Sequence, residues 1–142
     1  MTTTTRTSLA SDLRVSVARL ARRLRQEGAP GDATPSQLAT LALIYRSKPM
    51  TLGELAAAER VRPPSMTRIV AALEEHGLVK REQSPDDGRV LHVLITEKGR
   101  RAHEEYQKRR DEWLSKQLAH LSSDERKLLH RAAELLERLV DR

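Results

Sequence analysis

The sequence predicts a mainly α-helical protein with one small β-hairpin, an α+β fold. Over most of the 142 residues apolar side chains recur every three or four positions, as on the buried face of a helix. Three segments, TPSQ, TLGE and SSDE, have the Ser/Thr-x-x-Glu/Gln pattern that begins helices. Two β-rich segments, LVKREQ and VLHVLI, flank the turn-forming SPDDGR and predict the hairpin.

The first predicted helix covers residues 9–27, with arginines on the face opposite its apolar side chains. Its inward positions are Leu9, Leu13, Val17, Leu20 and Leu24. The residues that should end it are Gly28, Pro30 and Gly31.

The second predicted helix begins at TPSQ and runs to about Arg46. Thr34 can cap it, Pro35 suits the first helical turn, and Gln37 can bond back to the cap. The expected inward face consists of Leu38, Leu41, Ala42 and Tyr45.

A short helix and a longer one follow. Thr51 can cap the short helix over about 52–58, and Glu54 can reach back to complete a capping box. The proline pair 63–64 then begins a helix, because the first turn does not need the N–H groups that proline lacks. The inward positions of that helix are Met66, Ile69, Val70 and Leu73, and Gly77 ends it.

The hairpin comes next, with strands over 78–83 and 90–95. Thr96 should cap a long helix over about 97–119, and SSDE should cap a last helix. The apolar positions of the long helix are Ala102, Tyr106, Trp113, Leu114 and Leu118; those of the last are Leu128, Leu129, Ala132, Leu135, Leu136, Leu139 and Val140.

These elements follow one another in the order of a winged helix-turn-helix. In that fold the helix after the turn, here the one that begins at the proline pair 63–64, enters the major groove of duplex DNA. The hairpin is called the wing, and its loop reaches the minor groove or the backbone. Residues 34–99 would form this DNA-binding head.

Helical geometry indicates which side chains of the 63–75 segment face outward. With Met66 at the centre of the buried face, Arg68 lies at about 200° and Pro64 at about 160° around the axis, with Ser65 and Thr67 on the flanks. A guanidinium and two hydroxyls at a helix N-terminus, whose dipole favours phosphate, form a plausible edge for reading DNA. We expect base contacts from Pro64, Ser65, Thr67 and Arg68, and contacts with the DNA backbone from Arg60, Arg62 and Lys80.

Charge and composition favour duplex DNA over other partners. The chain has 26 Lys and Arg against 20 Asp and Glu, a formal net charge of +6, which favours polyanions. Residues 47–96 carry equal numbers of bases and acids, so a DNA-binding surface there requires segregated charge. Aromatic residues make up only 2% of the chain, which argues against single-stranded nucleic acids, whose bases stack on aromatic side chains.

The sequence contains no motif that would make the protein an enzyme. There is no cysteine, hence no disulfide, thiolate metal site or thiol switch. The histidines, His76, His92, His103, His120 and His130, show none of the recurrent metal spacings. No glycine-rich phosphate loop or nucleophile motif occurs, so we expect no cofactor, metal or catalytic residue. No apolar run suits a membrane span or signal peptide, so a cytoplasmic location is expected.

The stretch from about Thr34 to Gly99 resembles the MarR (multiple antibiotic resistance regulator) family of winged-helix transcription factors. The matching pieces are TPSQLATL, LGELAAAERVRPPSMTRIVAALEEHGLVKR, PDDGR and LITEKG. The most specific pattern is an Asp-x-Arg wing followed by Leu/Ile-Thr-x-x-Gly, at Asp87, Arg89, Ile95, Thr96 and Gly99. The flanking helices match in position, so residues 1–142 would form a single MarR-like domain.

The resemblance implies a transcriptional regulator, typically a repressor that a small ligand releases from DNA. It implies a homodimer in which helices over 9–27 and 97–142 interlock, so that two heads grip a pseudo-palindromic duplex. It also implies a small aromatic or anionic effector in a cleft between the dimer helices and each head. The residues themselves support a dimer, because the terminal helices carry more apolar side chains than a single head could cover. A compact monomeric core is the alternative.

In the wing, we expect Arg89 to enter the minor groove and Asp87 to hold it by a charge-assisted hydrogen bond. Asp86 would be solvated or bonded to local backbone. The alternative is that both acids only make the loop soluble.

Two other functions are weighed against DNA binding. A winged-helix module that binds proteins and not DNA would also have these elements, and Arg68 could then be an ordinary solvated arginine. The outward Arg68 between a capped short helix and a charged hairpin favours DNA. A small hydrolase or transferase would need a catalytic constellation that the sequence lacks.

Overall fold

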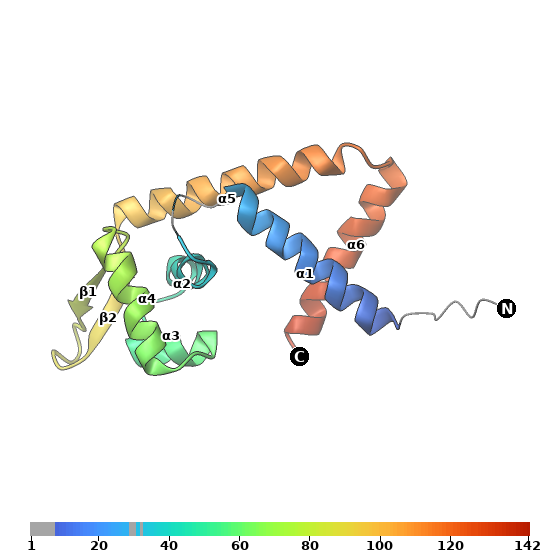
Figure 1. Ribbon diagram of the computed structural model, residues 1–142. Helices are drawn as coiled ribbons and strands as arrows, with labels where there is room; N and C mark the ends of the chain where they lie inside the picture. Colours follow the sequence, from blue (N-terminus) through green and yellow to red (C-terminus); the bar gives the residue numbers. More distant parts are fainter. Residues whose placement is uncertain (1–7, 29–30, 32) are drawn as a thin grey trace.

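The computed structural model describes residues 8–28, 31 and 33–142 and confirms a mainly helical fold with one hairpin (Figure 1). Six helices and two strands follow in the order α1 Leu9–Gly28, α2 Pro35–Arg46, α3 Leu52–Glu59, α4 Pro63–Glu75, β1 Val79–Gln83, β2 Leu91–Ile95, α5 Glu97–Leu118 and α6 Ser123–Val140. Each lies within one or two residues of its predicted position. Of the residues expected to end the first helix, Pro30 lies outside the described residues.

The capping predictions are confirmed at two helices and half confirmed at a third. Thr34 and Ser122 each form a complete capping box, with Gln37 and Glu125 as partners. At Thr51 the N–H of Glu54 donates to Oγ1 at 3.1 Å, but the described residues show no bond returning from the Glu54 side chain.

Helix α2 lies at the centre of the head and is more buried than predicted. The expected inward residues Leu38 and Leu41 are buried, but so are Thr40, Leu43 and Ile44. The prediction of a single inward face was incomplete because α2 contacts α4 and β2 as well as α5. Around it, the most deeply buried apolar side chains are Leu55, Met66, Val70 and Val93.

The wing is a two-stranded antiparallel sheet that is anchored in this core. Its register pairs Val79 with Ile95 and Gln83 with Leu91. The N–H of Val93 donates to the carbonyl oxygen of Met50 at 2.8 Å, which ties the hairpin to the segment before α3.

A tight junction joins the wing to α5. The Thr96 hydroxyl donates to the Gly77 carbonyl oxygen at 2.6 Å and accepts from the N–H of Gly99 at 3.0 Å. A Cβ at position 99 would overlap the carbonyl oxygen of Leu78, so only glycine fits there. The Thr-x-x-Gly pattern therefore sets how the head meets α5.

The terminal helices leave apolar side chains exposed. Figure 1 shows α5 spanning the molecule, with the head at its N-terminal end and the turn into α6 at its other end. Helix α1 packs against α5, whereas α6 buries no residue within the single chain. The exposed side chains include Leu9, Val17 and Leu20 on α1, and Leu128, Leu129, Leu135, Leu139 and Val140 on α6. No helix among the described residues has the length and apolar character needed to cross a membrane.

One histidine is part of the core. His103 on α5 is 3% exposed, and its ring centroid lies 4.4 Å from that of Tyr45 on α2. Burial lowers the pKa of His103, and the positive charges of Arg110 and Arg46 lower it further, against the opposing effect of Glu104.

This pKa predicts a loss of stability in mild acid. Because the unfolded chain binds a proton near pH 6.5 more readily than folded His103 does, the contribution of neutral His103 is present above that pH and is lost below it. Chemical denaturation at pH 7.5 and 5.5 should show a smaller pH effect in His103→Gln than in the wild type. The exposed His120→Gln is the control and should keep the wild-type pH effect. An equal pH effect in all three proteins would contradict the prediction.

Candidate nucleic-acid interface

The turn between α3 and α4 has an arginine where glycine is usual. The N–H of Val61 donates to the Ala56 carbonyl at 3.0 Å and the N–H of Arg60 to the Ala57 carbonyl at 3.2 Å, the two bonds of a Schellman motif. Arg60 adopts left-handed backbone angles, φ 53° and ψ 44°, which cost roughly 1–2 kcal/mol in a residue with a Cβ. The two bonds of the turn offset this cost, and the Arg60 side chain is exposed.

Helix α4 presents the predicted face to solvent. Met66 and Val70 are buried, whereas Pro64, Thr67 and Arg68 are exposed. Ser65 is half-buried on the flank. The Thr67 hydroxyl donates to the Pro63 carbonyl at 3.0 Å, so its oxygen remains available to outside groups as an acceptor.

The first turn of α4 offers few backbone N–H groups to a phosphate. Pro63 and Pro64 have no N–H, and the N–H of Ser65 donates to the Arg62 carbonyl at 2.9 Å. Arg62, the N-cap residue, makes no side-chain capping bond. The helix dipole remains, but anion contacts at this end must come from side chains, and the exposed Arg60 and Arg62 flank it.

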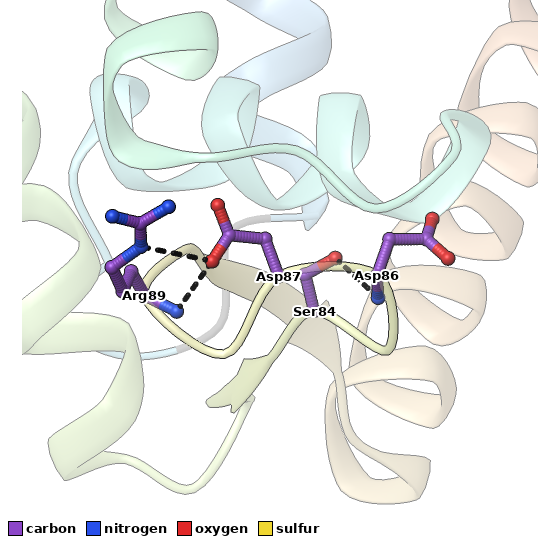
Figure 2. A network of polar contacts seen from close by, with 4 residues as sticks. All are labelled: Ser84, Asp86, Asp87 and Arg89. Carbon is purple, nitrogen blue, oxygen red and sulfur yellow. Dashed lines mark hydrogen bonds and ion pairs between the residues drawn. The ribbon is translucent and has the colours of Figure 1, made fainter.

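The wing loop contains the predicted contact between Asp87 and Arg89 (Figure 2). Oδ1 of Asp87 accepts from Arg89 Nε at 3.3 Å and from the backbone N–H of Arg89 at 3.0 Å. The side chain of Arg89 is 92% exposed, so most of its guanidinium is free to meet a partner. Next to it, the backbone N–H of Asp86 donates to Ser84 Oγ at 3.3 Å.

Two parts of the predicted interface, the wing loop and the start of α4, lie at the same end of the head (Figure 1), whereas Lys80 lies near the base of the hairpin, opposite Leu94. Figure 1 shows the wing loop and the start of α4 on the side of the head away from α5. The predicted backbone-contacting residue of the wing, Lys80, is exposed on β1, with its Nζ 3.8 Å from Glu82 Oε2. Sequence reasoning missed an ion pair behind this surface, in which Arg81 Nε lies 2.8 Å from Glu74 Oε1.

A cavity of about 410 Å³ lies among α2, α4 and α5, on the side of the head that faces the terminal helices. Its walls are mainly apolar, with Leu38, Leu41 and Leu73 among them. Lys98, His76 and His103 contribute polar groups. The described residues contain no group of three His, Asp or Glu side chains that could hold a metal ion.

Comparison with known proteins agrees with this geometry. The model of the MarR family matches residues 33–91. An uncharacterized HTH-type transcriptional regulator of Mycobacterium leprae is 44% identical over 133 residues, which cover 94% of this chain and 93% of the relative. A solved structure from Pseudomonas aeruginosa has 38% identity and a TM-score of 0.83, covering 93% of both chains. A MarR family protein from Bacillus stearothermophilus has 27% identity and a TM-score of 0.82, covering 94% of both chains. From its sequence, its winged helix-turn-helix and these relatives, the chain belongs to the MarR family.

Proposed function

We propose that the protein is a sequence-specific regulator of transcription that binds duplex DNA as a homodimer and acts as a repressor released by a small ligand. The observation that carries the proposal is the exposed face of α4, where Arg68 points to solvent directly opposite the buried Met66 and Val70. A rigidly held arginine on the second helix of a helix-turn-helix is suited to bidentate hydrogen bonds with guanine in the major groove.

Each residue of the interface has a proposed role. Ser65, Thr67, Arg68 and Pro64 contact bases, and Arg89 enters the minor groove with Asp87 orienting it. Arg60, Arg62 and Lys80 bind phosphates. Because the start of α4 lacks free N–H groups, Arg60 and Arg62 carry the anion contacts that helix amides provide in other proteins.

The dimer would form through the terminal helices, 9–27 and 97–142, leaving the head at 34–99 free to meet DNA. The exposed leucines and valines of α1 and α6 support this arrangement, since a monomer would expose them all to water.

The effector would occupy the cavity among α2, α4 and α5. Its apolar walls suit an aromatic body, and Lys98 could pair with an anionic group. Because the cavity touches both the recognition helix α4 and the long helix α5, a ligand there could change how the head is held.

The proposal implies a cytoplasmic protein, in the compartment of the bacterial chromosome, with no catalytic step. The rival function is protein binding through the same head without DNA. The two differ in salt dependence, since neutralised phosphates release counterions on binding and a protein partner of ordinary composition does not produce that steep dependence.

Selection of bound duplexes from a random library tests the function. We expect an enriched site with two related half-sites whose centres are about 10–11 bp apart or a multiple of that distance. Affinity for that site should fall steeply with salt concentration. Failure to enrich any duplex sequence would contradict sequence-specific binding.

Changing Arg68→Ala should weaken binding to the selected site by about 1–3 kcal/mol and relax base preference at one position of each half-site. The control is Arg101→Ala, which removes an exposed arginine paired with Glu97 on α5. Competition assays with substituted sites measure both effects. An equal loss on selected and random duplexes would instead identify Arg68 as a phosphate contact.

Changing Asp87→Ala should weaken operator binding by about two- to fivefold, the scale of an exposed ion pair, although it removes a negative charge. A purely repulsive acid would give tighter binding when removed. Part of the loss should persist in an Arg89→Ala background, because Asp87 also accepts from the backbone N–H of Arg89. Asp87→Asn keeps an acceptor for that N–H and should therefore lose less than Asp87→Ala.

Sedimentation should show a dimer at micromolar concentration. The interface should bury more than about 2,000 Å², as expected for an obligate dimer. Leu135→Asp should promote dissociation, because it places a charge on the exposed apolar face of α6. Glu134→Ala, on the polar face of the same helix, serves as the control. A folded monomer in the wild type would overturn the proposed dimer.

A further inference from the structure

The chain reverses direction sharply between the recognition helix and the wing. The N–H of Gly77 donates to the Glu74 carbonyl and that of Leu78 to the Leu73 carbonyl, both at 2.9 Å. Gly77 has a φ of 72°, which completes a Schellman turn. Strand β1 begins at Val79, directly after this turn. The backbone therefore holds the base of the wing against the end of α4, and the Val93–Met50 bond holds β2 against the segment before α3. No backbone bond among the described residues joins the outer part of β1 to α4.

The ion pair between Arg81 and Glu74 lies farther along β1 than this turn. Successive side chains of a strand point to opposite faces, so Arg81 points to the same side as the buried Val79, while Lys80 and Glu82 point to solvent. On that side Arg81 Nε donates to Glu74 Oε1 at 2.8 Å. Both side chains are about one-third exposed, 29% for Arg81 and 34% for Glu74, so water screens the pair less than a fully exposed one.

The position of Glu74 on α4 also favours an ion pair with Arg81. It lies in the last turn of α4, where the negative end of the helix dipole disfavours an acid, and no basic residue occupies that turn. Arg81 supplies the missing positive charge from the neighbouring strand. Glu75 occupies the same turn and is exposed, and it makes no ion pair within the described part of the chain.

From this arrangement we infer that Glu74 and Arg81 are positioning residues that set the angle between the recognition helix and the wing. The inference rests on the proposed function, because the angle matters only if α4 and Arg89 must reach one duplex together. The pair links β1 directly to α4 beyond the Gly77 turn, in addition to the anchoring of β2 at Met50. Neither residue needs to touch DNA for this role.

A pair of matched variants tests the role. Glu74→Gln and Glu75→Gln make the same change in charge in the same helical turn, so they affect phosphate attraction and the helix dipole alike. Only Glu74→Gln removes the negative charge that pairs with Arg81, leaving a neutral amide oxygen as acceptor. We expect Glu74→Gln to weaken binding to the selected operator by about five- to tenfold relative to Glu75→Gln, with no such difference on random duplex.

Arg81→Gln separates positioning from phosphate contact. In the double variant with Glu74→Gln the operator loss should be no larger than in either single variant, as for two residues acting through one bond. A phosphate contact by Arg81 would lower the slope of log affinity against log salt by about one unit for each contact removed. An unchanged slope is expected, and a lowered slope would overturn the assignment.

Hydrogen exchange in the free protein tests the link between β1 and α4 without DNA. The β1 and β2 amides should exchange faster in Glu74→Gln than in Glu75→Gln, because β1 loses its ionic link to α4. Equal exchange and equal operator affinity in the two variants would overturn the inference, as would faster exchange with unchanged affinity. If the wild type bound no duplex, the proposed function would fail, and the inferred role in DNA recognition would fail with it even if exchange showed the attachment intact.

Discussion

Burial of one face of α4 determines what the rest of the head can do. Met66 and Val70 are fully buried and Leu73 is 2% exposed. Exposing even one such side chain costs about 1.5–3 kcal/mol, so α4 cannot rotate about its axis without a large loss of stability. Arg68 is consequently held outward by side chains that never contact a partner. The wing depends on the same core, because Val79 and Val93 are buried in it.

The sequence predicted the elements well because the signals that begin and end them are local. Capping at Thr34 and Ser122 involves residues only three positions apart, and the proline pair before Ser65 leaves few alternatives to a helix start. The second buried face of α2 could not be predicted, since a helix enclosed on several sides lacks the amphipathic period that indicates its neighbours.

The features of the candidate site that follow from helical periodicity or from near neighbours in the chain were predicted. Those that depend on contacts between distant residues were missed. The outward direction of Pro64 and Arg68 follows from helical spacing, and the contact of Asp87 with Arg89 spans two residues. The two prolines that leave the start of α4 without free N–H groups were visible in the sequence, but their consequence for anion contacts was not drawn from it. The left-handed backbone of Arg60 could not be predicted, because glycine is the residue that normally indicates such a turn.

The junction at Gly99 has a mechanical consequence. Since no Cβ fits between this residue and the Leu78 carbonyl, and Thr96 bonds to both Gly77 and Gly99, the start of α5 is tied closely to the head. Helix α5 has 22 residues and is therefore about 33 Å long. With its far end held, a tilt of roughly 5° would carry the head about 3 Å, close to the rise of one base pair along duplex DNA. A helix of this length attached in this way would convert a small change in packing at its far end into a change in register between the head and DNA.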